Sequence, residues 1–227
     1  MCSSTRCLLG VAALLLPAAQ LPAAVQDPEL GVELVGNAGV ILSDGVTSLL
    51  VDLPYEPGAF GYQRYDPALL RPAGEAVSVI THHHRDHFAP DLFLPRVGWR
   101  VIGPPSAVAT VPTDRVVAGD SVAVGAFQVV ALRTPHTGDH RSYRIRWRGR
   151  VLHFTGDTED AAALLAGPPL DLLFLTPWLA CTLADAGRPA AAARAILYHR
   201  NPDGSDRHCG SAEPLPQGTR IALAGTG

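Results

Sequence analysis

The stretch THHHRDHF, residues 81–88, places four histidines and one aspartate within eight positions. It follows AVSVIT at 76–81, an apolar run rich in β-branched residues that is typical of a buried strand. Each imidazole ring carries a donor and an acceptor, so a cluster of rings is hard to bury without partners. A strand that ends in such a loop indicates an α/β protein whose functional site lies at the strand end.

The spacing within this loop is that of a metal-binding motif. The pattern H-x-H-x-D-H is formed by His82, His84, Asp86 and His87, all nitrogen or carboxylate donors suited to Zn²⁺. In an extended segment His82 and His84 point the same way, whereas Asp86 and His87 lie past the bend and face a neighbouring point. This favours two adjacent metals over a single cage and leaves His83 outside it. The alternative is a solvated cluster of histidines.

Three further residues of ligand type follow strand-like runs later in the chain. They are His136 after FQVVALR, Asp157 after RVLHF and a short turn, and His199 after AILY. Because each stands where a strand ends, we expect them to converge with the histidine loop on one face. His208 and His140 compete with His199 for the last place in such a set, and Gly-Asp-Thr around Asp157 is also a common turn sequence.

The rest of the chain predicts a mixed α/β architecture. Alternating apolar residues predict strands at 32–36, 39–45, 46–52, 76–81, 100–103, 121–133, 141–157, 170–177 and 219–225, with turns at Ser43–Gly45 and Gly149. Helices are expected at 89–96, at 158–167 with Thr158 as N-cap, and in the alanine-rich run 189–195. Residues 54–67, rich in Pro, Gly and Tyr, are expected to form a long loop.

Composition limits the broad class of protein. The chain has 227 residues, of which 47% are hydrophobic and 17% charged, enough for one sizeable core. We expect a single domain over residues 25–227. A net charge of −3 argues against nucleic acid as a partner, because nucleic-acid binding usually calls for a basic face. Nothing in the sequence indicates an oligomeric state.

The first residues predict an export signal. Arg6 precedes the short apolar run CLLGVAALLLPAA at 7–19, and small residues near Ala23 and Ala24 suit cleavage. The run is too short for a comfortable transmembrane helix, although an uncleaved anchor is the alternative. We therefore expect a signal peptide over 1–24, a periplasmic or secreted protein, and no stable membrane insertion after cleavage. Cys181 and Cys209 then remain, either free or paired in an oxidising compartment.

These motifs resemble the metal-ligand motifs of the metallo-β-lactamase-fold superfamily. The resemblance rests on H-x-H-x-D-H followed by PHT (135–137), TGD (155–157) and YH (198–199), and it covers nearly the whole chain after the signal. It implies an αββα sandwich of two mixed sheets flanked by helices. It also implies a first zinc site of His82, His84 and His136, a second of Asp86, His87 and His199, and Asp157 bridging both.

The same resemblance implies a dinuclear zinc hydrolase of a small molecule. An aspartate at the position of Asp157 is similar to the hydrolase branches, and GNAGVILSDG (36–45) with LLVD (49–52) is most similar to the sugar-phosphate lactonase-like group. A hydroxide shared by two zincs and oriented by Asp86 is implied to cleave an ester, thioester, lactone, amide or phosphate bond. Iron or manganese also suits these ligands.

Two alternatives accompany this reading. A protein of the same fold that binds metal without turnover, as a binding or sensing module, is the alternative function. For substrate contacts the candidates are His140, Trp178 and Tyr62, although each of these side chains is equally suited to ordinary packing or to an exposed loop.

Overall fold

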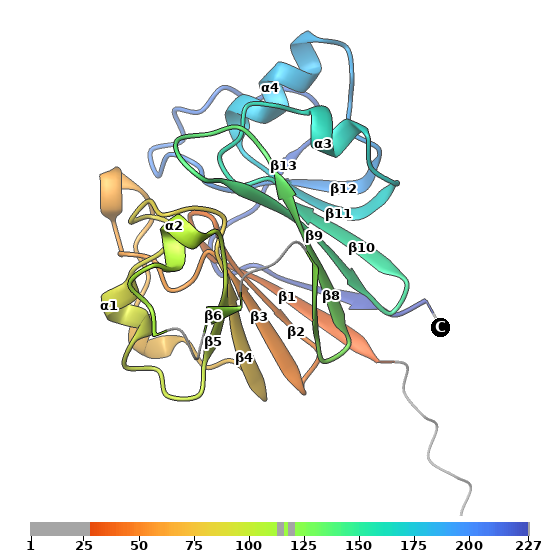
Figure 1. The fold of residues 1–227 in the computed structure, drawn as a ribbon. Coiled ribbons are helices and arrows are strands. Elements are labelled where there is room, and N and C mark those ends of the chain that lie inside the picture. Colours follow the sequence, from red (N-terminus) through yellow and green to blue (C-terminus); the bar gives the residue numbers. More distant parts are fainter. Residues whose placement is uncertain (1–27, 113–115, 118–120, 227) are drawn as a thin grey trace, which may run out of the picture.

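The computed structural model describes residues 28–112, 116–117 and 121–226, and the expected signal peptide over 1–24 lies outside them. Within the described residues the chain forms two seven-stranded mixed sheets that lie face to face (Figure 1). Helices flank the sheets on their outer sides, so the expected αββα sandwich is confirmed. The described residues contain no helix long and apolar enough to cross a membrane.

The first sheet, here the N-terminal sheet, has the strand order β14-β1-β2-β3-β4-β5-β6. Its strands are β1 (Glu29–Gly36), β2 (Gly39–Ser43), β3 (Thr47–Val51), β4 (Glu75–Val79), β5 (Arg100–Ile102), β6 (Val116–Val117) and β14 (Arg220–Ala224). The expected meander is confirmed, because β1, β2 and β3 pair in antiparallel order. The turn between β2 and β3 is held by Asp44, whose carboxylate accepts from the backbone N–H groups of Val46 and Thr47.

The second sheet, here the C-terminal sheet, has the order β13-β12-β11-β10-β9-β8-β7. Its strands are β7 (Ser121–Val124), β8 (Phe127–Arg133), β9 (Arg141–Trp147), β10 (Arg150–Phe154), β11 (Leu170–Leu175), β12 (Ala192–Leu197) and β13 (Glu213–Pro214). The expected hairpin about Gly149 is confirmed, with Trp147 opposite Arg150. The run 121–133 is a hairpin of two strands rather than one strand, because Gly125 takes a φ of +54° in the turn between β7 and β8.

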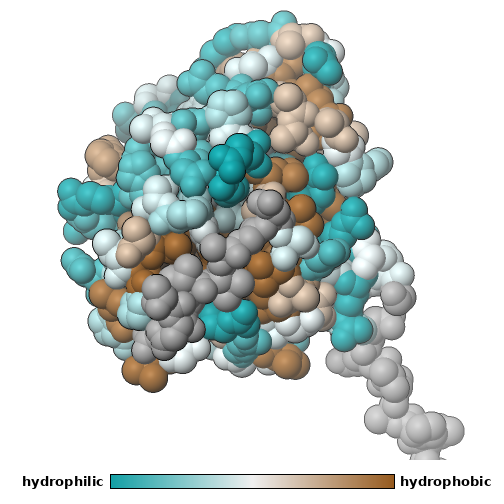
Figure 2. Space-filling view, viewed as in Figure 1, coloured by the Kyte–Doolittle hydropathy of each residue, from teal (hydrophilic) through white to brown (hydrophobic). Residues whose placement is uncertain are grey.

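The helices are short and lie on both sides of the sandwich. They are α1 (Pro90–Phe93), α2 (Pro105–Val108), α3 (Ala162–Leu165) and α4 (Pro177–Asp185), with 3₁₀ turns η1 (Ala59–Gly61) and η2 (Pro67–Leu69). Figure 1 shows α1 and α2 beside the N-terminal sheet and α3 and α4 over the outer face of the C-terminal sheet. The molecular face in Figure 2 mixes hydrophilic and hydrophobic side chains.

The main core lies between the sheets and draws on both. Its largest side chain, Trp147, is fully buried, and Phe154 stacks on Phe174 with ring centroids 4.7 Å apart. The indole N–H of Trp147 donates to the carboxylate of Asp44 in the other sheet, at 3.2 Å. Burying aromatic rings of this size supplies much of the hydrophobic stabilisation of the sandwich.

Two of the expected helices are corrected by the structure. The segment 158–167 is helical only over Ala162–Leu165, and Thr158 does not cap it, because its hydroxyl accepts from Asp160 N–H ahead of the helix. The alanine-rich run 189–195 is not a helix, since Ala192–Leu197 forms β12, parallel to β11. Pairing with β11 satisfies the backbone there, and this tertiary pairing overrides the helix propensity of alanine.

His153 lies inside β10 as expected, and its side chain is buried. Its Nδ1 atom has no hydrogen-bond partner, and burial lowers the pKa of the ring to about 3. An unfolded histidine has a pKa of about 6.5. The unfolded chain therefore binds more protons below that pH, so stability present above pH 6.5 is lost as the pH falls towards 3.

Replacing His153 with leucine is expected to reduce this acid sensitivity. At pH 5 the wild type should lose about 2 kcal/mol of unfolding free energy through this one ring, a loss that H153L escapes. Urea unfolding of both chains at pH 7.5 and pH 5 measures the difference, and the other histidines contribute equally to both. Equal losses in the two chains would contradict the assignment.

Candidate metal centre

The strand directions bring several loops to one edge of the sandwich. Strands β3 and β4 are parallel, so their carboxyl ends lie together. In the other sheet β10, β11 and β12 are parallel, and β8 points the same way as β10 because both are antiparallel to β9. The expected ligands follow the carboxyl ends of β4, β8, β10 and β12, and this edge is where they meet.

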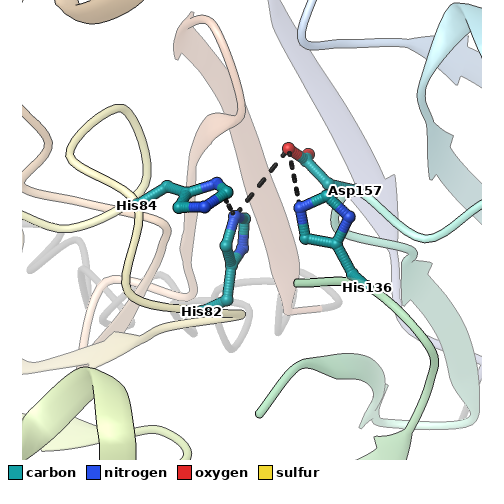
Figure 3. A group of neighbouring side chains, drawn as sticks. All are labelled: His82, His84, His136 and Asp157. Atoms are coloured by element: carbon teal, nitrogen blue, oxygen red, sulfur yellow. Dashed lines mark hydrogen bonds and ion pairs between the residues drawn. The ribbon is translucent and has the colours of Figure 1, made fainter. Parts of the chain in front are cut away.

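The first group of ligand-type side chains consists of His82, His84, His136 and Asp157, with one donor atom of each within 4.8 Å of the others. His82 Nε2 lies 2.9 Å from His84 Nδ1, and Asp157 Oδ2 lies 3.8 Å from His82 Nε2 and 3.9 Å from His136 Nε2. Figure 3 shows His82 and His84 approaching from one side and His136 and Asp157 from the other.

The second group consists of Asp86, His87 and His199, again with donor atoms within 4.8 Å of one another. His199 Nε2 lies 3.0 Å from Asp86 Oδ2, and His87 Nε2 lies 3.6 Å from the same oxygen. All three side chains are buried, at 2% exposure or less. His199 occupies the place for which His208 and His140 were alternatives.

Asp157 faces both groups. Its Oδ1 lies 3.2 Å from His87 Nε2, and its Oδ2 lies 3.4 Å from His199 Nε2 as well as near the histidines of the first group. A carboxylate that lies between two sets of nitrogens has the placement that a bridging ligand needs. All seven residues expected from the sequence are therefore brought together, in the two groups that the sequence analysis anticipated.

Many of the buried polar atoms in this cluster lack a hydrogen bond. Unpartnered buried atoms include His87 Nε2, His136 Nε2, His199 Nε2, Asp86 Oδ1 and Asp157 Oδ1. Leaving a buried donor or acceptor unpaired costs about 1–3 kcal/mol each, so native folds rarely concentrate such atoms without a reason. Nitrogen and carboxylate oxygen atoms directed at common points are the donor set that a divalent cation satisfies.

The ring protonation states suit this donor role. Burial lowers the pKa values of His82, His84 and His136, so these rings are neutral near pH 7 and keep a lone pair. Burial alone raises the pKa of Asp157, yet the adjacent rings of His87 and His199 hold that pKa well below its usual range. The carboxylates of the second group are therefore stabilised by positive charge on the neighbouring rings. A bound cation supplies such charge as well as a proton does.

Asp52 and Thr81 fix the orientation of two of these rings. The fully buried Asp52 carboxylate lies 2.8 Å from His87 Nδ1 and accepts from Thr81 N–H at 2.7 Å. The Thr81 hydroxyl donates to Asp52, so it accepts from His82 Nδ1–H at 3.0 Å. Both rings are thus held by Nδ1 and direct Nε2 towards the cluster, as metal-binding histidines usually do.

His140 holds the backbone of Asp157 in the same way. Its Nε2 accepts from Asp157 N–H at 3.1 Å, and its Nδ1–H donates to the Thr134 hydroxyl at 2.8 Å. Burial lowers the pKa of His140 to about 3, so the ring stays neutral. His140 is 1% exposed and both nitrogens are occupied, which argues against the expected substrate contact and against an exposed loop position. Gly156 is required here, because a Cβ would lie 2.3 Å from His140 Nε2.

Asn37 joins the two halves of the second group. Its side-chain Nδ2 donates to the Asp86 carbonyl at 2.9 Å, and its own carbonyl accepts from His199 N–H at 2.8 Å. Asn37 takes a φ of +48°, a left-handed conformation that asparagine tolerates better than most residues. The Tyr198 hydroxyl, next in sequence to His199, accepts from Gly156 N–H at 2.6 Å.

Two aromatic side chains expected at the site lie against His199. The ring of Tyr62 is 4.2 Å from the His199 ring, edge to face, and the ring of Trp178 is 5.2 Å away. Trp178 stands in the first turn of α4, a helix that the sequence analysis did not anticipate. It also lines a cavity of about 450 Å³ between α4 and residues 201–207. A disulfide between Cys181 and Cys209 ties α4 to the segment after His199.

Sequence reasoning missed the positioning residues. Asp52, Thr81 and Asn37 each stand at the end of a strand or in a turn beside the motifs, and the role of each depends on contacts distant in sequence. One signal was available, because an aspartate directly after the apolar run TSLLV at 47–51 is a polar residue at a buried strand end.

Comparison with known proteins places the fold. No family model matches the chain. A hydroxyacylglutathione hydrolase of Chelativorans sp. (strain BNC1) is 35% identical over 131 residues, which cover 54% of this chain and 48% of that protein. The match therefore spans about half the length of this curated relative.

Solved structures with the same architecture agree with that similarity. The metallo-β-lactamase fold protein YhfI of Bacillus subtilis superposes with a TM-score of 0.60 at 16% identity, covering 87% of this chain and all of that one. Igni18, a metallo hydrolase of Ignicoccus hospitalis, gives 0.61 at 12% identity, covering 86% and 98%. Such low identities establish the fold alone. The chain therefore has the metallo-β-lactamase fold, with histidine and aspartate motifs at its strand ends.

Proposed function

We propose that this protein is a hydrolase that uses two metal ions to cleave a bond in a small molecule. The observation that supports it most is the arrangement of Asp157, whose carboxylate lies within 3.9 Å of ring nitrogens of both groups of histidines. One group alone would hold a single ion. Two adjacent groups that share a carboxylate are typical of dinuclear hydrolytic sites.

The donor set fits two zinc ions. The first group offers three imidazoles and the shared carboxylate, and the second offers two imidazoles, Asp86 and the same shared carboxylate. Four nitrogen and oxygen donors suit Zn²⁺ in each case, while iron and manganese accept the same donors. Such ions would satisfy the buried nitrogens and oxygens of the cluster that lack hydrogen bonds.

Two bound cations would polarise the attacked bond and lower the pKa of a water molecule towards neutrality. The chain's own residues set up that chemistry. Asp157 would hold the two ions together, and Asp86, at 2% exposure beside His199, would orient the attacking water. Asp52 and Thr81 hold His82 and His87 with Nε2 directed towards the cluster, and His140 keeps Asp157 in place.

The similarity to a hydroxyacylglutathione hydrolase supports an acyl bond as the one that is cleaved. We place carboxylic ester, thioester and lactone bonds first among the substrates, and amide and phosphate bonds after them. The proposed partner is a small molecule and not a nucleic acid, in line with the net charge of −3.

Export is part of the proposal. The disulfide between Cys181 and Cys209 supports it, because such bonds persist in the periplasm or outside the cell and are rare in the cytosol. We propose that the protein acts there after removal of residues 1–24.

Removal of metal is expected to abolish activity and to lower the melting temperature. The purified chain should contain about two metal ions, measured by elemental analysis, and a chelator should remove both activity and metal together. Zinc should restore activity. The melting temperature should fall without metal, because the buried donors are then left uncompensated. Activity that persists in the chelated protein would contradict the mechanism. Two bound zincs without turnover of any ester, thioester, lactone, amide or phosphodiester would instead support a non-catalytic binding module.

A further inference from the structure

Phe60 has an unusual position for a large apolar side chain. It is 70% exposed, and its φ of +52° lies in the left-handed region inside the 3₁₀ turn η1. Exposure forgoes the 1.5–3 kcal/mol that burial of such a side chain supplies, and the left-handed conformation costs about 1 kcal/mol more than it would for glycine. A phenylalanine at this position therefore contributes little to the stability of the fold.

The loop that carries Phe60 is fixed to the metal-ligand loop. The guanidinium of Arg85 donates to both carboxylate oxygens of Glu56, and Glu56 N–H donates to the Arg85 carbonyl at 2.7 Å. Gly58 lies under the Arg64 side chain, where a Cβ would be 2.6 Å from a guanidinium nitrogen. These contacts join the start of the loop to the segment that contains His84 and pack Arg64 over Gly58, two residues before Phe60.

The ring of Phe60 stands edge-on to His84, with centroids 6.2 Å apart. Two residues further on, Tyr62 packs on His199, and Trp178 packs on the same ring from α4. His84 belongs to the first group of ligands and His199 to the second. The metal centre is therefore bordered by aromatic rings beside both groups, and among these Phe60 is the one left open to solvent.

We infer that Phe60 is a substrate-binding residue that contacts an apolar acyl or aryl group next to the bond to be cleaved. The inference rests on the proposed function and narrows its substrate class to esters, thioesters or lactones with such a group. An exposed phenyl ring beside the attacked position removes apolar surface of the substrate from water, while the ions hold the polar end. Its own exposed surface is buried in the same step.

The test compares short and long acyl groups in wild type and the variant Phe60→Ala. The substrates are p-nitrophenyl acetate and p-nitrophenyl octanoate. The ratio of kcat/KM for the octanoate to kcat/KM for the acetate should fall about tenfold in F60A, which is the effect of returning one to two methylene groups to water. Binding is measured separately by calorimetry on the zinc-loaded full chain, with acetohydroxamic and octanohydroxamic acids as probes. Both share one metal-binding head, so their affinity ratio reports the apolar contact and should fall equally in F60A.

Leu69→Ala provides the matched control, because Leu69 is an apolar residue of similar exposure, at 73%, and lies in η2 rather than η1. It should leave both ratios unchanged. The inference would be overturned if the ratios in F60A stay at the wild-type value, whether the rates and affinities for short and long probes are unchanged or fall by the same factor. If no ester is hydrolysed but octanohydroxamate binds more tightly than acetohydroxamate in a Phe60-dependent manner, the inference holds and the proposed reaction fails.

Discussion

Replacing Asp157 with asparagine is expected to reduce hydrolysis about 10³-fold and to lower the bound metal from two ions per chain towards one. The carboxylate faces both groups of ligands, with oxygens 3.2 Å from His87 Nε2 in the second group and 3.8 Å from His82 Nε2 in the first. A unit charge about 4 Å from a cation contributes about 4 kcal/mol at an effective dielectric constant of 20, which corresponds to about 10³ in affinity. The amide keeps the shape and loses this attraction, while the two cations continue to repel each other.

The measurement combines elemental analysis with initial rates on the same preparation. Asp171→Asn is the control, since Asp171 lies in β11 and pairs with Arg150 away from the ligand cluster. It should keep both metals and full activity. Should D157N retain two tightly bound ions, the bridging role of Asp157 would be wrong. Circular dichroism of the metal-free variants distinguishes loss of metal from loss of fold.

Replacing Asp52 with asparagine is expected to weaken metal binding in the second group about 10- to 100-fold, the usual effect of losing a carboxylate behind a ligand histidine. Asp52 accepts the Nδ1 proton of His87 at 2.8 Å. An amide that presents its NH₂ there would favour the tautomer protonated on Nε2, the atom that faces Asp86 and Asp157. The rate should fall with the occupancy of this group, because Asp52 does not touch the substrate.

Stepwise titration with zinc gives the two affinities separately. Only the weaker or later binding step should change in D52N, and high zinc should restore much of the rate. That rescue by metal is a readout that a purely structural defect would not produce. Asp66→Asn, which alters an exposed carboxylate that caps η2, is expected to behave like the wild type. An Asp52 variant with unaltered titration would remove this residue from the account of the site.

The ligand set was predictable from sequence because the ligand-type residues occur in short motifs. His82, His84, Asp86 and His87 lie within six positions, and the later partners each follow an apolar run that is recognisable as a strand. Residue type and strand ends are local properties. Since parallel strands bring their carboxyl ends to one edge, local information was enough to bring the ligands together.

The secondary structure was less predictable where tertiary pairing decides it. Alanine favours helix in isolation, but Ala192 and Ala195 pair with residues of β11, and this pairing is not visible in the local sequence. The helix α4 was missed for the opposite reason, because TPWLACTLAD at 176–185 begins with proline after a strand and offers few periodic polar residues. Its signal was the cap, with the Thr176 hydroxyl accepting from Leu179 N–H.

The residues that orient the ligands escaped prediction because their partners are distant in sequence. Asp52 acts on His87 across 35 positions, and Asn37 acts on Asp86 across 49. No spacing rule connects such pairs. His140 shows the same difficulty, because its sequence position beside Gly138 and Asp139 suggests an exposed turn while the fold buries it beneath Asp157.

Both ligand groups draw on both sheets, and this has a consequence for when the protein can acquire its metals. The first group is complete only with Asp157, and the second only with His199, 28 residues before the end of a chain of 227. A chain made from its N-terminus presents the histidine loop well before Asp157 and His199 are added. Neither group of donors is then complete until β10 and β12 have taken their places in the C-terminal sheet, so assembly of the site depends on the pairing of both sheets.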